Sequence, residues 1–194
     1  MRLHPEETLV LMALPIESQR AFETAGIQVH YCGIGKINAA FKTTELLMSQ
    51  RIKQVLNLGT AGSHKFQTHS VVECIEFVQR DMDLSPLGFP RGETPQDSIA
   101  GKLSVAAISK YPKGVCGTGD VFENSIPKLE CDLVDMEAYA IAKVCRRLGV
   151  GFHSFKYITD GSDDNAHKDW VANLKPASQA LLKIYFEVTG QAVY

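Results

Sequence analysis

The sequence lacks the features that mark membrane proteins and nucleic-acid-binding proteins. Among its 194 residues the longest apolar run is Leu9 to Ile16, well below the roughly 18 residues that suggest a membrane-spanning helix. The 20 Lys and Arg nearly balance the 22 Asp and Glu, for a net charge of -2, so no basic face is expected for a phosphate backbone. The composition therefore predicts one globular domain, residues 1–194, with neither a membrane nor a nucleic acid as partner.

Metal-binding and export signals are also missing. The five cysteines are scattered and never spaced as CxxC, and the six histidines form no HExxH motif. The opening residues MRLHPEE contain a proline and two acids where a signal peptide has a basic and then an apolar segment. We therefore expect a cytoplasmic protein with reduced thiols, no bound metal and no cofactor.

Common motifs of nucleotide binding and hydrolysis are absent as well. The sequence contains neither GxGxxG nor GxxxxGK[ST], so neither a dinucleotide-binding fingerprint nor a P-loop is present. It also lacks GxSxG, which disfavours hydrolysis by a Ser-His-Asp triad.

Short β-type segments alternate with helical ones along the chain. The expected strands are 7–14, 27–33, 54–59, 71–79, 114–120 and 150–160, and the expected helices are 15–25, 36–50, 134–148 and 170–188. Residues 81–97 read as a long loop, and the pattern of 103–111 fits either a helix or a strand. This alternation predicts an α/β fold with a largely parallel or mixed sheet.

Candidate functional residues follow the expected strands. Because ligands bind at the carboxyl ends of strands in such sheets, three glycine-rich turns and three carboxylates should converge on one rim. The segments are Glu17, GIGKINAA (33–40), NLGTAGS (57–63), GTGDVF (117–122), DMEAYAIA (135–142) and ITDGSDD (158–164). Taken singly, each has a structural explanation: Glu17 suits a helix N-terminus, and Asp160, Asp163 and Asp164 suit turn caps.

Taken together and in this order, the motifs resemble the nucleoside phosphorylase/hydrolase superfamily, and within it the 5'-methylthioadenosine/S-adenosylhomocysteine nucleosidases. The resemblance covers about Leu9 to Leu182 and includes the DxDxSxxG stretch from Asp81 to Gly88. It implies a three-layer α/β/α fold around a mixed, partly barrel-like sheet, usually in a homodimer. It also implies hydrolysis of the bond between adenine N9 and ribose C1' of a small-molecule purine nucleoside, as in nucleoside catabolism and methionine salvage.

The resemblance further implies roles for individual residues. Asp160 matches the general acid at adenine N7, Glu17 the base that activates water, and Glu137 the acid that binds the ribose hydroxyls. The matching residues around the substrate are Met136 at the sugar, Phe122 at the purine, Thr60 near the water, Lys156 near the site, and Trp170 and Leu87 at the 5' group, Leu87 reaching it across a dimer interface. These roles agree with the chemistry, because cleavage builds positive charge on the sugar and negative charge on the purine.

Several positions differ from the family pattern. Thr60 and Lys156 replace a serine and an arginine, Glu123 follows Phe122 where an apolar residue is common, and the 97–113 region lacks a helix. Asn57 stands where hexameric phosphorylases of the same fold carry an arginine for phosphate. The alternatives are therefore a purine nucleoside phosphorylase, with Arg20 as a phosphate contact, and a non-catalytic nucleoside-binding module.

Overall fold

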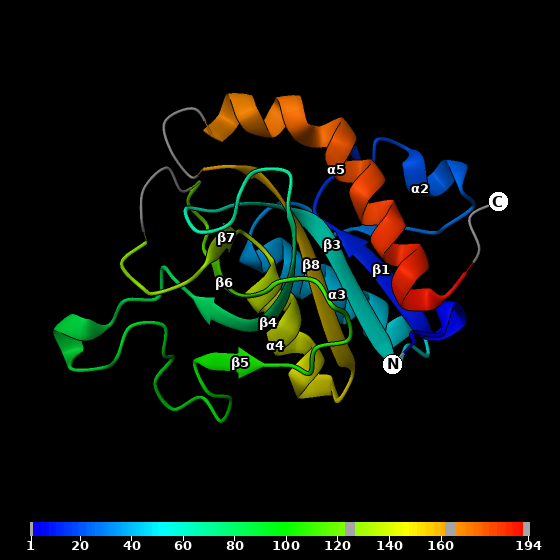
Figure 1. The fold of residues 1–194 in the computed structure, drawn as a ribbon. Coiled ribbons are helices and arrows are strands. Elements are labelled where there is room, and N and C mark those ends of the chain that lie inside the picture. The colour runs from blue at the N-terminus through cyan, green and yellow to red at the C-terminus, as the bar shows by residue number, and fades with distance from the viewer. Residues whose placement is uncertain (1, 123–126, 162–165, 192–194) are drawn as a thin grey trace.

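A computed structural model describes residues 2–122, 127–161 and 166–191 of the chain (Figure 1). Its strands are β1 (Thr8–Met12), β2 (His30–Tyr31), β3 (Gln54–Gly62), β4 (Val71–Gln79), β5 (Lys102–Ser104), β6 (Lys113–Thr118), β7 (Leu133–Asp135) and β8 (Gly151–Asp160). Its helices are α1 (Pro15–Ser18), α2 (Ala21–Thr24), α3 (Lys36–Ser49), α4 (Ala138–Leu148) and α5 (Ala166–Thr189). Two short 3-10 turns, η1 (Pro5–Glu7) and η2 (Ser85–Leu87), complete the regular structure of these residues.

The strands form one mixed sheet that partly closes on itself. The order β2-β1-β3-β7-β6-β4-β5 is joined by β8, which runs parallel to β3 and antiparallel to β4. β3, β8, β4, β6 and β7 therefore form a ring, in which β7 meets β3 through Gly62 and Val134. This ring is the barrel-like part of the sheet that the family resemblance implied.

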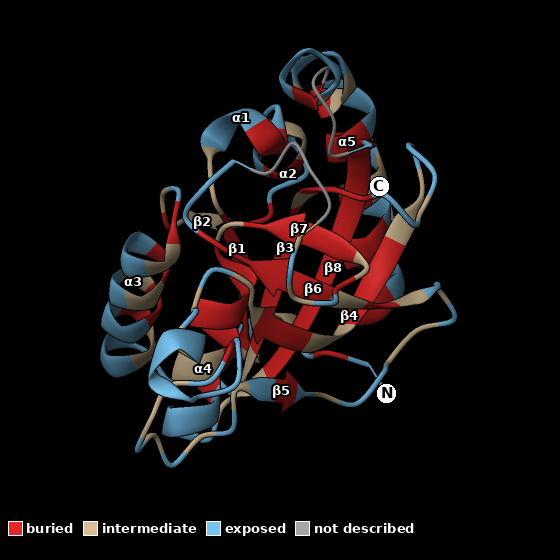
Figure 2. Ribbon diagram, turned by 90° about the vertical axis from the view of Figure 1, so that its left-hand side faces the viewer, coloured by how far each residue is buried: buried red, intermediate tan, exposed pale blue. Residues whose placement is uncertain are grey.

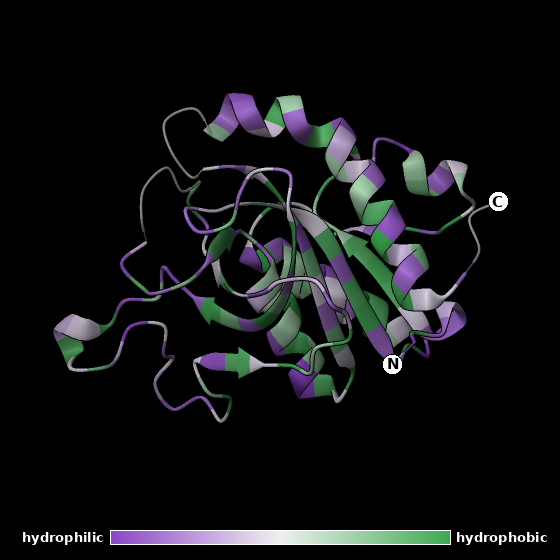
Figure 3. Cartoon of the chain, in the orientation of Figure 1, coloured by the Kyte–Doolittle hydropathy of each residue, from purple (hydrophilic) through white to green (hydrophobic). Residues whose placement is uncertain are grey.

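Helices cover both faces of the sheet (Figures 1 and 2). α3 and α4 pack on one face, where Leu46 and Ile141 are buried with strand residues, and α5 and α2 cover the other, where Leu181 and Phe22 are buried. Apolar residues are concentrated in the strands between these layers (Figure 3). The predicted three-layer α/β/α fold is confirmed. Among the described helices, none is both long and apolar enough to cross a membrane.

The five cysteines are all buried and form no disulfide. Cys74, Cys116 and Cys145 are fully buried, and Cys32 and Cys131 are only 7% and 4% exposed. Their thiols therefore pack as small apolar groups in the core.

Two predicted helices differ from the observed ones. Residues 15–25 form α1 and α2 rather than one helix, because Gln19 and Arg20 between them adopt left-handed backbone angles, with φ of 46° and 61°. Residues 134–135 belong to β7, and α4 begins only at Ala138. Glu17 lies just before the break between α1 and α2, and Glu137 lies just before the start of α4. Both are among the predicted site residues.

Segment 105–112, which follows β5, has no regular structure and is held by a buried carboxylate of β4. Glu73 Oε1 accepts a hydrogen bond from the Ile108 N–H at 2.6 Å, and Oε2 accepts from the Ser109 hydroxyl and from Lys113 Nζ, both at 2.6 Å. Burial by itself raises the pKa of Glu73, but Lys113 and Ser109 hold this pKa below its usual value. A contact distant in sequence therefore sets this conformation, which local periodicity could not decide.

We expect Glu73→Gln to lower the free energy of unfolding at neutral pH by roughly 1–3 kcal/mol, because Lys113 loses its buried charged acceptor. A carboxylate with a lowered folded pKa stabilises the fold above its unfolded pKa, and this contribution is lost as the pH falls through the folded value. The difference in free energy of unfolding between Glu73→Gln and wild type should therefore shrink below about pH 4. Urea unfolding at neutral and acid pH measures this difference. Glu76→Gln, in a partly exposed ion pair with Lys102, is the control and should change the stability less. Equal effects of both variants would contradict the role of Glu73.

Candidate active site

A cavity of about 320 Å³ opens where the carboxyl ends of the strands meet. It is lined by Ala13, Leu14, Glu17, Ile34, Thr60, Ala61, Gly62, Arg80, Val121, Phe122, Val134, Asp135, Met136, Glu137, Thr159, Asp160, His167 and Trp170. The three carboxylates expected on one rim, Glu17, Glu137 and Asp160, all line this cavity and are at most 7% exposed. Their predicted convergence is therefore observed.

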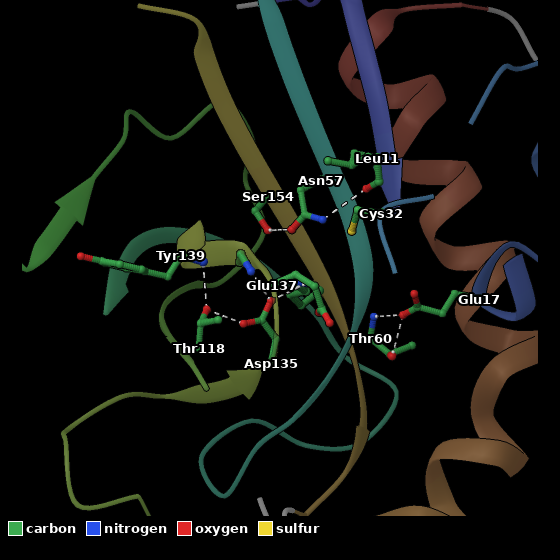
Figure 4. A network of polar contacts seen from close by, with 12 residues as sticks. Leu11, Glu17, Cys32, Asn57, Thr60, Thr118, Asp135, Glu137, Tyr139 and Ser154 are labelled. Carbon is green, nitrogen blue, oxygen red and sulfur yellow. Dashed lines mark hydrogen bonds and ion pairs between the residues drawn. The ribbon is translucent and has the colours of Figure 1, made fainter. Parts of the chain in front are cut away.

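Glu17 lies in α1, shortly after β1, and its carboxylate is held by three hydrogen-bond donors. Its Oε1 accepts hydrogen bonds from the backbone N–H and the hydroxyl of Thr60, both at 2.9 Å (Figure 4). Its Oε2 accepts from the backbone N–H of Leu14 at 3.1 Å. Gly59 makes room for this arrangement, because a Cβ there would lie 3.3 Å from Glu17 Oε1 and 3.3 Å from Lys156 Nζ. Glu17 is thus an oriented carboxylate in the cavity wall, suited to accept a proton.

Glu137 lies between β7 and α4, and its carboxyl group is buried in the cavity wall. Its Oε1 accepts a hydrogen bond from the N–H of Gly35 at 3.0 Å, and Gly35 has a φ of 91°, a conformation that favours glycine. Burial, followed by the charge of Asp135, raises the pKa of Glu137 to about 8, against the opposing charge of Lys156. Glu137 is therefore largely protonated at neutral pH.

A buried cation lies behind these acids. Lys156 of β8 is 2% exposed, and its Nζ lies 2.9 Å from Asp135 Oδ2. Asp135 also accepts hydrogen bonds from the Thr118 hydroxyl at 2.5 Å and from the Ala138 N–H at 2.9 Å (Figure 4). Burial alone would lower the pKa of Lys156 and raise that of Asp135, but the attraction between them reverses both shifts. Lys156 does not line the cavity, so it acts through Asp135 and Glu137.

Asp160 ends β8 at the cavity and is connected to α5. Its Oδ2 accepts a hydrogen bond from the Thr159 hydroxyl at 2.7 Å, and Asn173 of α5 donates to the Thr159 carbonyl oxygen at 2.8 Å. Asp160 itself is 5% exposed. The carboxyl group is therefore placed in the cavity wall by the end of a strand and by the helix packed over it.

Three of the motifs singled out in the sequence are joined by one ionic network. Lys36 Nζ lies 2.5 Å from Asp81 Oδ1 and 3.4 Å from Asp120 Oδ2. The Lys36 N–H donates to Asp120 Oδ1 at 2.8 Å, and the Asp120 N–H donates to Asp81 Oδ2 at 2.8 Å. None of the three side chains lines the cavity. The network instead fixes the turn whose Gly35 N–H binds Glu137.

The remaining predicted residues divide between the cavity and the surface. The residues that line the cavity are Thr60, Phe122, Met136 and Trp170. Leu87 is 71% exposed in η2, on the loop that projects from the body in Figure 1, and does not line the cavity of its own chain. Sequence reasoning missed Arg80 and His167. Arg80 directly follows β4, so the strand-end rule that selected the acids would have found it, whereas nothing in the sequence distinguished His167.

The part of the chain that the structure describes offers no cluster of three or more His, Cys, Asp or Glu arranged to hold a metal ion. Glu123, Asp163 and Asp164, which the sequence also singled out, lie outside the described residues.

Comparisons with known proteins agree with the fold. A family model described as the phosphorylase superfamily matches residues 24–188. The 5'-methylthioadenosine/S-adenosylhomocysteine nucleosidase of an Exiguobacterium species is 31% identical over 179 residues, 81% of this chain and 77% of the relative. The aminodeoxyfutalosine nucleosidase of Helicobacter pylori is 28% identical over 177 residues, with the same shares covered. The nucleosidase structure from Neisseria meningitidis, in complex with methylthio-immucillin-A, has a TM-score of 0.83 at 23% identity, covering 96% of this chain and 100% of that chain.

The chain therefore belongs to the phosphorylase superfamily. Both relatives carry the name of nucleosidases, and the resemblance to 5'-methylthioadenosine/S-adenosylhomocysteine nucleosidases is confirmed.

We expect Glu137 to make the fold less stable as the pH rises. A carboxyl group whose folded pKa is raised contributes fully below its unfolded pKa, and that contribution is lost as the pH approaches the folded value of about 8. The melting temperature of wild type should therefore fall relative to that of Glu137→Gln from about pH 4.5 upwards, and the two should converge in acid.

Asp135→Asn is the control of opposite sign, because the pKa of Asp135 is lowered and its ionised form stabilises the fold at neutral pH. Thermal unfolding across the pH range measures both variants. Parallel profiles for wild type and Glu137→Gln would contradict the raised pKa of Glu137.

Proposed function

We propose that the protein hydrolyses the N-glycosidic bond of adenine nucleosides with a 5'-thio substituent, 5'-methylthioadenosine, S-adenosylhomocysteine or both, and releases adenine and the 5-thioribose. The observation that carries this proposal is the enclosure of Glu17, Glu137 and Asp160 in one cavity, each from a different strand end. The names of the relatives support the same reaction. A module that only binds nucleosides would not need all three acids.

Each acid has a separate role in this reaction. Asp160 donates a proton to adenine N7 as the bond between C1' and N9 breaks and its electron pair goes to the purine. Glu17 takes a proton from the water whose oxygen bonds to C1'. Glu137 binds the ribose hydroxyls through hydrogen bonds. Met136 lies against the sugar and Phe122 against the purine.

Water is favoured over phosphate as the nucleophile by the surroundings of Asn57. This residue is 1% exposed, and its amide donates to the Leu11 carbonyl oxygen at 3.2 Å and accepts from the Ser154 hydroxyl at 2.9 Å (Figure 4). A position that would hold a cationic phosphate ligand in the hexameric phosphorylases is thus occupied by core hydrogen bonds. Arg20, the other candidate phosphate contact, is exposed and does not line the cavity.

A thioether at the 5' position is favoured by the apolar part of the cavity wall. Ile34, Val121 and Phe122 are 47%, 64% and 50% exposed, so they lie towards the opening, while the three acids are buried deeper. Leu14 and Trp170 extend this apolar surface. Such a wall binds a methylthio or homocysteinyl group better than a hydroxyl or a phosphate.

The proposal includes a cytoplasmic location. All five cysteines are buried and form no disulfide, which is typical of proteins in reducing compartments. Release of adenine from a 5'-thio nucleoside there would be a step of nucleoside catabolism and methionine salvage.

Incubation with 5'-methylthioadenosine in phosphate-free buffer should release adenine, and added phosphate should not raise the rate. Asp160→Asn should lower kcat by roughly two decades or more with a modest change in KM, because the amide cannot deliver a proton. Asp169→Asn, which changes an exposed acid of α5, is the matched control and should be fully active. Activity that needs phosphate, or full activity of Asp160→Asn, would contradict the proposal. S-adenosylhomocysteine, aminodeoxyfutalosine and adenosine as parallel substrates identify the preferred 5' group.

We further propose that two copies of the chain form the working enzyme. α3 and the turn before it carry an exposed apolar stripe, in which Ile37, Phe41 and Met48 are 82%, 71% and 72% exposed. The stripe continues into Ile34, which lines the cavity, so a second copy seated on it would border the substrate. The exposed Leu87 would reach the 5' group of that second copy. A monomer would leave all these side chains in water.

Phe41→Asp and Leu87→Asp should each weaken dimerisation, because both place a charge on the proposed interface. Leu87→Asp should also impair use of 5'-thio substrates more than use of adenosine. Sedimentation and kcat/KM measure these effects, with Lys183→Asp, an exposed change on α5, as the control. A wild-type protein that sediments as a fully active monomer would contradict the proposed assembly.

A further inference from the structure

Trp170 lines the cavity and also makes a hydrogen bond through its indole nitrogen. Its indole Nε1–H donates a hydrogen bond to the hydroxyl oxygen of Thr60 at 2.9 Å. The same hydroxyl lies 2.9 Å from Glu17 Oε1 and donates to it. An unbroken series of two hydrogen bonds therefore runs from Trp170 of α5, through Thr60 of β3, to the carboxylate of Glu17 in α1.

The direction of this series is fixed by the chemistry of the three groups. An indole N–H can only donate, and an ionised carboxylate can only accept, whereas a hydroxyl can do both. With the indole proton on one of its lone pairs, the Thr60 hydroxyl is left to direct its own proton at Glu17. Without the indole the hydroxyl could rotate, and it could then donate its hydrogen bond to water instead of to Glu17.

We propose that Trp170 is a positioning residue for Glu17, acting through Thr60 to hold the carboxylate ready to accept a proton from water. This inference rests on the proposed function, in which Glu17 is the base. Trp170 thus has two roles, an apolar wall for the substrate and a donor behind the base, and only the second depends on its N–H.

The other donors to Glu17 explain why the orientation of the Thr60 hydroxyl matters. The backbone N–H groups of Thr60 and Leu14 determine where the two carboxylate oxygens lie. Of the three donors that hold Glu17, the Thr60 hydroxyl alone is free to rotate, so it is the contact that another side chain can control. The position of α5 is therefore coupled to the hydrogen bonding of Glu17 through Trp170 and Thr60.

A double-mutant cycle separates the two roles of Trp170. Trp170→Phe keeps an aromatic wall and removes the N–H, and it should lower kcat for 5'-methylthioadenosine roughly three- to tenfold, the usual effect of one lost hydrogen bond, with little change in KM. In a Thr60→Val background, which lacks the hydroxyl, the same change should have less than about a twofold effect on kcat. Thr60→Ser keeps the hydroxyl and should restore the full sensitivity to Trp170→Phe. Equal losses in the wild-type and Thr60→Val backgrounds would mean that Trp170 is only a wall, and would overturn the inference.

A second measurement does not depend on catalysis. Trp170 is the single tryptophan of the chain, so its indole N–H gives one assignable NMR signal. Hydrogen exchange of this proton should be faster in Thr60→Val than in wild type and nearly unchanged in Thr60→Ser. An exchange rate unaffected by Thr60→Val would show that the hydrogen bond is absent and would overturn the inference while leaving the proposed function intact. A wild-type protein that releases no adenine would overturn the proposed function, whatever the indole exchange shows.

Discussion

The buried ion pair between Lys156 and Asp135 is the interaction on which the cavity depends. Acids enclosed together repel one another, and removal from water raises the free energy of every charge. Lys156 Nζ, 2.9 Å from Asp135, supplies one positive charge behind the acids of the wall. Asp135 can therefore remain ionised while Glu137 holds a proton. Removal of either partner would leave an uncompensated charge in the interior, so the pair both keeps Asp135 ionised and is needed for the stability of the fold around the site.

Several residues of the glycine-rich motifs hold the acids in place without lining the cavity themselves. Gly59 leaves space for Glu17 and Lys156 to approach, and Gly35 presents an N–H to Glu137. Lys36 fixes that second turn through two aspartates. Because Gly59 lies on a strand of the sheet and the acids lie at or just after strand ends, the acids are held by rigid elements and by the contacts of their neighbours.

Local sequence patterns predicted most of the strands and helices in their order, but they missed β7 and left the region of β5 open between helix and strand. The strand-end rule then predicted the acids of the cavity. The rule holds because parallel strands deliver their following residues to one edge. Features that depend on distant partners could not be read in this way. The break at Gln19 and Arg20 needs left-handed backbone angles in residues that rarely adopt them. The closure of the ring depends on β8 pairing with both β3 and β4, and segment 105–112 depends on Glu73.

The same limit applies inside the site. The sequence placed Lys156 near the reacting centre but could not identify Asp135 as its partner, because the pairing depends on two strands that are not adjacent in the ring. It placed Trp170 at the 5' group by resemblance to a phenylalanine, and a phenylalanine has no N–H to donate. The indole contact with Thr60 is visible only when α5 is packed over β3.

Because all five cysteines are buried, the rate at which each thiol is labelled can report local opening of the structure. A buried thiol reacts with an alkylating reagent only when the structure around it separates, so the labelling rate at each cysteine measures a local opening equilibrium. Cys74 and Cys116 lie in paired strands of the ring, Cys145 lies in α4, and Cys32 follows the two-residue strand β2 at the sheet edge. The thiols therefore sample the centre, one helical layer and the margin of the same fold, and their reactivity ranks these regions by the free energy needed to expose them.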